Sequence, residues 1–300
     1  MAKARKPKKP RSFGRFLWNA FRVCFVVFVA IPVLWVALYK FVPPPVTYLM
    51  LKRAAEGKGM DYRWRGVDRI SPNLVNAAIA AEDARFCQHN GFDFEAIERA
   101  FANNEKRPNR IRGGSTISQQ TAKNVFLWPN RDWIRKGFET YFTGLIELIW
   151  GKRRIMEMYL NVAEMGPGLY GAEAAAQKYF KTSAADLTPA QASRLAAILP
   201  NPNRYRAVGS GPYVQRRSRR IGGAAGQIRR EGLATCVLDR ARRGDAPEPV
   251  RAPAPKKAAE PPPPPADPIG EIILAPPEPE PAPPPADAPP PAEPPAPEGQ

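Results

Sequence analysis

Residues 71–93 read SPNLVNAAIAAEDARFCQHNGFD, and this stretch combines the pattern of a buried helix with a cluster of reactive side chains. Ser71 followed by Pro72 is a typical helix start, because the serine hydroxyl caps the first turn and proline fits the first helical position. The apolar residues that follow, up to Ile79, recur at helical spacing. The sequence therefore predicts a helix that ends near Glu82, beside a hydrophobic core.

The rest of the sequence between residues 45 and 243 keeps this helical pattern. Apolar stripes run through residues 134–149 and 152–164, and Thr188-Pro189 repeats the start signal. Ser115 is the expected cap of the helix that follows it. Because clear runs of strand periodicity are lacking, we predict one mainly α domain of roughly 200 residues, large enough for a real core.

The beginning of the chain predicts a membrane anchor. Residues 1–15 are rich in lysine and arginine and contain no acid, and residues 16–42 are apolar. About 20 helical residues span a hydrocarbon core of about 30 Å, and a basic flank stays in the cytoplasm. A cleaved signal peptide is the alternative, but the run ends at Tyr39 to Pro45 without a small-residue cleavage site. We therefore expect one transmembrane helix and a periplasmic domain at residues 45–243.

The other end differs in composition. Residues 244–300 are dominated by proline, alanine and glutamate, with few large apolar side chains. Such a segment cannot bury enough surface to offset its ordering entropy, so we expect a disordered proline-rich tail. It is either a spacer or a docking segment for a partner protein.

The net charge and the cysteines indicate which classes of partner and of site to expect. The net charge is +17, yet no nucleic-acid module is recognisable, so an anionic membrane or a phosphorylated lipid is the expected partner. Cys24, Cys87 and Cys236 have no metal-ligand spacing. An odd and sparse set argues against a disulfide framework, so we expect unpaired thiols.

Three segments carry the candidate chemistry. Glu82 and Asp83 close the first helix, where a partly desolvated carboxylate can act as a general base, although an acidic pair is usually solvated charge. Gly113-Gly114 precedes a polar helix, and its exposed N–H groups suit an anion such as a pyrophosphate, although a plain turn has the same pattern. Glu139 follows Arg135 by four residues, as either a surface ion pair or a second carboxylate in the same cleft.

Together these segments resemble the penicillin-binding-protein glycosyltransferases, specifically the monofunctional biosynthetic transglycosylases. No Ser-x-x-Lys motif of a penicillin-binding domain follows them. The matching residues are Glu82-Asp83-x-x-Phe86-x-x-His89-x-Gly91-x-Asp93, Gly113 to Asn124, Arg135-Lys136-x-x-Glu139, Tyr159-Leu160-Asn161, Gly166 to Gly171, and Leu199-Pro200-Asn201-Pro202.

The resemblance implies a lysozyme-like helical fold and polymerisation of lipid II in the inner membrane. Glu82 would deprotonate the acceptor sugar, which attacks the anomeric carbon of the growing glycan chain with inversion, and undecaprenyl diphosphate would leave. Glu139 would be the second catalytic carboxylate and organise the donor diphosphate. The implied substrate-binding residues are Asp83, Arg85, Phe86, His89, Arg99, Gly114, Ser115, Gln120, Lys123, Asn124, Arg131, Arg135 and Lys136.

Several alternatives stay open at this point. The family allows a divalent ion such as Mg²⁺, but no metal-ligand set is readable and no cofactor is required by the sequence. Cell-division or elongation proteins are the expected class of partner, and nucleic acid is not. A muramidase or lytic transglycosylase also uses a glutamate on a helical fold, and a non-catalytic membrane scaffold is the remaining alternative. We expect hydrogen bonding from His89, and either a solvated face or lipid contact from Arg216 to Arg230.

Overall fold

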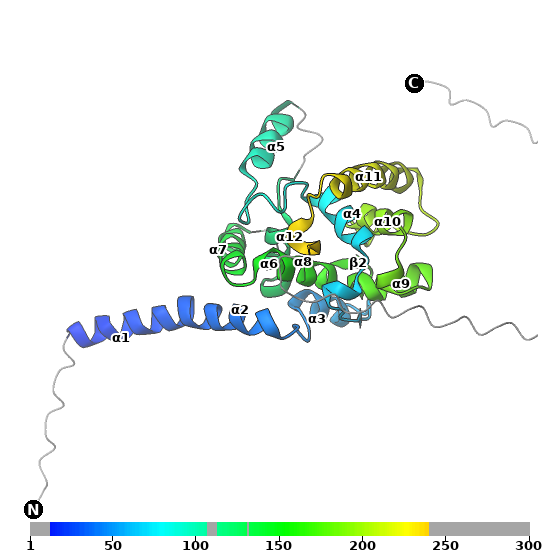
Figure 1. Cartoon of the computed structure of the whole chain (residues 1–300). Coiled ribbons are helices and arrows are strands. Elements are labelled where there is room, and N and C mark those ends of the chain that lie inside the picture. The colour runs from blue at the N-terminus through cyan, green and yellow to red at the C-terminus, as the bar shows by residue number, and fades with distance from the viewer. Residues whose placement is uncertain (1–12, 107–112, 131, 240–300) are drawn as a thin grey trace, which may run out of the picture. The chain divides into compact units, whose positions relative to one another are not determined.

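The computed structural model describes residues 13–106, 113–130 and 132–239, and this part of the chain is mainly helical, as predicted (Figure 1). The predicted tail at residues 244–300 lies outside the described residues. The elements in chain order are α1 (Phe13–Phe25), a π-helical stretch (Val26–Ala30), α2 (Ile31–Phe41), α3 (Tyr48–Ala55), β1 (Asp61–Tyr62), a 3-10 turn (Val67–Arg69), α4 (Pro72–Glu82), α5 (Phe94–Lys106), α6 (Ile117–Phe126), α7 (Trp133–Ile149), α8 (Gly151–Val162), β2 (Glu164–Gly166), β3 (Leu169–Tyr170), α9 (Gly171–Phe180), a 3-10 turn (Ala184–Asp186), α10 (Pro189–Ile198), α11 (Pro212–Arg230) and α12 (Thr235–Leu238).

The apolar N-terminal segment is one helix, Phe13–Phe41, whose 29 residues are long and apolar enough to cross a membrane. Its C-terminal half is fixed to the folded domain by hydrogen bonds to its backbone. The indole N–H of Trp150 donates to the Val36 carbonyl oxygen at 2.7 Å, and Arg154 Nη2 donates to the Tyr39 carbonyl oxygen at 2.9 Å. The anchor helix and α8 are therefore joined directly rather than through a loose linker.

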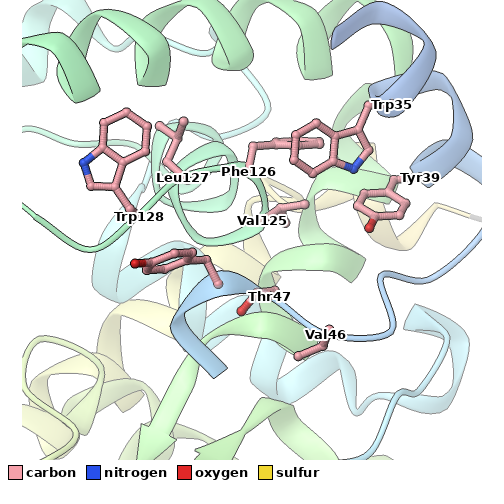
Figure 2. A pocket seen from close by; sticks show the side chains of 9 residues that line it. Trp35, Tyr39, Val46, Thr47, Val125, Phe126, Leu127 and Trp128 are labelled. Carbon is pink, nitrogen blue, oxygen red and sulfur yellow. The ribbon is translucent and has the colours of Figure 1, made fainter. Parts of the chain in front are cut away.

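A pocket of about 380 Å³ lies where this anchor helix meets the end of α6 (Figure 2). Trp35 and Tyr39 line it from α2, residues 46–48 line it from the start of α3, and residues 125–128 line it from α6. The ring of Trp35 meets Phe126 edge-on, with ring centroids 5.2 Å apart. The pocket therefore lies at the junction between the N-terminal apolar helix and the rest of the domain.

Two groups of helices form the core of the domain. Helices α4, α10 and α11 pack against one another, and α6 packs on α7 and α8. The predicted helix start at Ser71 is confirmed, because its hydroxyl accepts from the Asn73 amide at 3.3 Å and donates to the Leu187 carbonyl oxygen at 2.9 Å. This second bond ties the start of α4 to the segment before α10.

The expected cap at Ser115 is wrong by one residue. Thr116 caps α6, accepting from the Gln119 amide at 3.2 Å, while Gln119 Oε1 accepts from the Thr116 amide at 3.0 Å. This reciprocal pair satisfies two backbone donors that the first turn of a helix otherwise leaves free. Ser115 is consequently exposed just ahead of the helix.

A small sheet in the order β1-β3-β2 was not predicted from the sequence. Its strands have only two or three residues, too few to produce an alternating pattern. Gly168 (φ +65°) allows the close approach of β3 to the segment before β1, since a Cβ there would lie 2.1 Å from the Lys58 carbonyl oxygen. The sheet thus connects the segment after the anchor to the turn between α8 and α9.

Replacing Gly168 with alanine is expected to lower the free energy of unfolding by at least ~2 kcal/mol, because both the left-handed backbone and the Lys58 contact oppose a side chain. The matched control is Gly223→Ala in α11, where a Cβ meets nothing within 4 Å. We expect that control to be neutral or stabilising by up to ~1 kcal/mol. Denaturant unfolding of both variants checks this, and equal stabilities would contradict the role given to Gly168.

Candidate active site

Glu82 is the last residue of α4, and its carboxylate meets groups from two other helices. Gln120 Nε2 of α6 donates to Glu82 Oε2 at 3.0 Å, and Arg217 Nη2 of α11 lies 3.2 Å from Glu82 Oε1. Lys123, one turn along α6 from Gln120, is close enough to act on the carboxylate electrostatically. The side chain retains 14% exposure, so one edge stays accessible while the rest is covered.

The neighbouring carboxylate, Asp83, has a different role in the structure. Asp83 Oδ2 accepts from the backbone amide of Ile117 at 3.0 Å, at the N-terminus of α6. Its Oδ1 lies 2.9 Å from His89 Nε2, which donates when the ring carries its proton there. Both oxygens of this buried group are therefore used within the protein. Asp83 joins the end of α4 to the beginning of α6, and this places Glu82 beside Gln120.

Burial raises the pKa of Glu82 above its ordinary value of 4.5, while the hydrogen bond from Gln120 and the charges of Arg217 and Lys123 oppose that rise. Burial also raises the pKa of Tyr159 well above its usual value, with Glu82 and Asp83 adding to the effect. Glu82 is thus a partly desolvated carboxylate whose proton affinity is increased, as a general base requires.

The space in front of Glu82 is a pocket of about 230 Å³. Arg85 and Arg99 line it, and both contact Glu95 of α5, with Arg99 Nη1 at 3.3 Å from Glu95 Oε2. The predicted Asp83, Gly114 and Ser115 also line this pocket. Six of the predicted site residues therefore border one space, namely Glu82, Asp83, Arg85, Arg99, Gly114 and Ser115.

The second predicted carboxylate, Glu139, is buried in α7 between two cations. Arg135 Nη1 lies 2.8 Å from Glu139 Oε2, and Lys136 Nζ contacts Glu139 Oε1. Lys136 also lines a pocket of about 240 Å³ that shares Gly114 and Ser115 with the pocket of Glu82. The two halves of the predicted site are therefore neighbours across residues 113–116, although Arg135 and Glu139 line neither pocket.

Two further predicted residues, Phe86 and Asn124, line neither of these two pockets. Phe86 is fully buried, and Lys152 Nζ lies 4.6 Å from its ring centroid, so Phe86 supports the site from within the core rather than offering a surface to substrate. Asn124 is partly exposed beside Lys123 on α6. Arg131 lies outside the described residues.

Two features were missed from the sequence. Arg217 was read only as part of a basic helix, because nothing in its local pattern shows which arginine faces inward. The expectation of unpaired thiols is wrong for Cys87 and Cys236, which form a disulfide across 149 residues of sequence. The fold brings the two cysteines together, and their spacing carries no signal of it. Cys24 is free and exposed.

The described residues do not fit a resident divalent ion. No group of three or more histidine, cysteine or acidic side chains gathers in the part of the chain that the structure describes. The oxygens of Asp83 and Glu139 are already committed to hydrogen-bond donors and cations of the protein.

Comparison with known proteins agrees with this geometry. A family model described as "Transglycosylase" matches residues 51–224, more than half of the chain. The chain belongs to the transglycosylase family. The resemblance inferred from the sequence is thus confirmed, and Glu82, Gln120, Glu139 and Arg217 all lie within the matched residues of the transglycosylase domain.

Relatives of the transglycosylase domain are similar over most of the chain. A biosynthetic peptidoglycan transglycosylase of Caulobacter vibrioides is 60% identical over 227 residues, covering 76% of this chain and 99% of the relative. The protein of the same name from Rhodospirillum centenum is 51% identical, covering 71% of this chain and 94% of the relative. The one from Jannaschia sp. is 47% identical, covering 80% of this chain and 100% of the relative.

Replacing Asp83 with asparagine is expected to destabilise the transglycosylase domain by about 2–3 kcal/mol, because one of the two buried donors then faces an amide N–H instead of a carboxylate oxygen. Denaturant unfolding measures this loss. The control is Asp186→Asn, at an exposed position in a 3-10 turn. If both variants unfold at the same denaturant concentration, Asp83 does not hold α4 and α6 together.

Proposed function

We propose that this transglycosylase is a peptidoglycan glycosyltransferase that polymerises lipid II into glycan strands, with Glu82 as the general base. The observation that carries the proposal is the environment of Glu82, a partly desolvated carboxylate that faces a pocket and is contacted by Gln120 and Arg217. The names of the relatives support the peptidoglycan substrate.

The proposed step is attack of an acceptor hydroxyl on the anomeric carbon of the growing glycan. Glu82 accepts the proton of the 4-hydroxyl of the acceptor sugar as the new bond forms, and the configuration of the anomeric carbon inverts. Gln120 and Arg217 hold the carboxylate by its two oxygens, which fixes the direction from which it accepts a proton. A base held in this way lowers the entropic cost of reaching the transition state.

Cationic side chains on the donor side suit the departing undecaprenyl diphosphate. Lys136 on α7 lines the pocket that shares Gly114 and Ser115 with the pocket of Glu82, and Lys123 on α6 is close enough to Glu82 to act on it electrostatically. Their positive charge stabilises the negative charge that develops on the leaving group. Glu139 contacts Arg135 and Lys136 and therefore orients these cations rather than the reacting sugar.

The proposed location is the inner membrane, with the N-terminus in the cytoplasm and the catalytic domain in the periplasm. The apolar helix Phe13–Phe41 and the basic residues before it support this orientation. The Cys87–Cys236 disulfide supports it independently, because disulfides persist in oxidising compartments such as the periplasm. Cell-division or elongation proteins are the class of protein partner that we propose.

A lytic transglycosylase, which cleaves finished glycan, has no need of a site for a diphosphate. The Gly114–Ser115 segment with Lys136 in the same pocket therefore favours synthesis, as do the names of the relatives. A non-catalytic scaffold would have no use for a desolvated carboxylate that costs stability.

Replacing Glu82 with glutamine is expected to reduce lipid II polymerisation by about 10²–10⁴-fold, because the variant lacks a proton acceptor. Its melting temperature should be no lower than that of the wild type. The native pKa is raised, so the ionised carboxylate opposes folding once the pH exceeds the unfolded value. Glu98→Gln, at an exposed position in α5, is the control. Near-normal polymerisation by the Glu82 variant would overturn the assignment of the base.

Replacing Arg217 with alanine is expected to shift the acidic limb of the kcat/KM profile to higher pH. Removing this cation removes a contact that favours the ionised form, so the pKa of Glu82 rises further. The matched control is Arg216→Ala, the exposed neighbouring arginine. An unchanged limb in the Arg217 variant would show that this ion pair does not tune the base.

A further inference from the structure

Cys87 lies in the turn that carries two groups of the active site. This turn, residues 83–91, follows Glu82 directly and includes Asp83 and His89, which contact each other at 2.9 Å. The disulfide from Cys87 leads to Cys236 in α12, with Cα atoms 5.7 Å apart. The covalent bond therefore joins the active-site turn to the last helix that the structure describes.

The helix at the other end of the disulfide is itself fixed to the domain. Arg153 Nη1 of α8 donates to the Val237 carbonyl oxygen at 2.7 Å, and both Ala234 and Val237 are buried. A helix of four residues has little surface of its own with which to hold anything else. The disulfide thus connects the turn to α8 through a short, anchored segment.

The other attachments of the turn are noncovalent, and they begin with Asp83, whose Oδ2 accepts from the Ile117 amide at 3.0 Å, and Arg85, which contacts Glu95. The Thr116 hydroxyl donates to the Gly91 carbonyl oxygen at 2.6 Å, and the Phe86 ring is buried against Lys152. These contacts hold the two ends and the centre of the turn, while its exposed residues Ala84, Gln88 and Asn90 face solvent. Cys87 is the covalent attachment of this turn to a distant part of the chain.

We infer that the Cys87–Cys236 disulfide is a positioning pair for the active-site turn, so that turnover depends on its oxidised state. This inference rests on the proposed role of Glu82. Reduction by dithiothreitol adds two electrons and two protons to the disulfide, giving two thiols and the cyclic disulfide of the reagent. The turn is then held by its noncovalent contacts alone. A small displacement of groups beside the base lowers the rate far more than it lowers substrate affinity.

The experiment uses the full-length protein in lipid nanodiscs with a Cys24→Ser background, so that only the paired cysteines remain. Alkylation followed by mass spectrometry, with and without dithiothreitol, counts the free thiols. Lipid II polymerisation then gives kcat and KM for four samples. These are the parent, the parent reduced with dithiothreitol, the same protein after reoxidation, and a double variant that adds Cys87→Ala and Cys236→Ala to the parent. Val237→Ala is the matched control, because it weakens the packing of α12 and leaves the disulfide intact.

We expect thiol labelling of the parent only after reduction. The double variant and the reduced parent should lose kcat on the order of tenfold with little change in KM, and reoxidation should restore the parent. The assay temperature is well below the melting temperature of each protein compared. Under these conditions Val237→Ala should keep its kcat although its melting temperature falls. A parent that does not polymerise lipid II would instead overturn the proposed function.

Three results would overturn the inference while the parent remains active. Free Cys87 and Cys236 in protein isolated from an oxidising compartment would show that the disulfide does not form. An unchanged kcat in the double variant would show that it does not position the turn. An equal loss of kcat in Val237→Ala would assign the effect to the stability of the C-terminal segment.

Discussion

The fold and the site both depend on the buried carboxylate of Asp83. It accepts the first backbone amide of α6 and contacts His89, so it holds the end of α4 against the beginning of α6. Because Glu82 precedes it by one peptide bond, the same contact fixes the proposed base beside Gln120. A buried charge of this kind is tolerated only when its partners are in place. The contacts of Asp83 therefore affect both the stability of the domain and the position of Glu82 in the active site.

The two carboxylates predicted for catalysis sit in contrasting surroundings. Glu82 is largely desolvated and retains an accessible edge, and burial outweighs its cationic neighbours in setting its pKa. Glu139 is enclosed by Arg135 and Lys136 and lines neither pocket. Different environments give chemically identical groups different roles. This contrast supports the proposed roles, in which Glu82 transfers the proton and Glu139 orients the cations.

Local patterns predicted most of the helices and the principal residues of the site. Ser71-Pro72 and Thr188-Pro189 start helices as expected, because capping depends on adjacent residues. Features made by distant segments could not be predicted in this way. Arg217 reaches Glu82 across 135 residues, and Cys87 pairs with Cys236 across 149. The short strands of the sheet were missed because two or three residues are too few to give an alternating pattern.

The most direct test of this account is the ionisation of Glu82 itself. A ¹³C NMR titration of the glutamate carboxyl groups in the full-length protein, with the Glu82 signal assigned by its loss in Glu82→Gln, measures that pKa without a substrate. The account predicts a midpoint above the ordinary value of 4.5. A midpoint at or below that value would mean that the cationic neighbours outweigh burial, and Glu82 would not be the desolvated base on which the proposed mechanism depends.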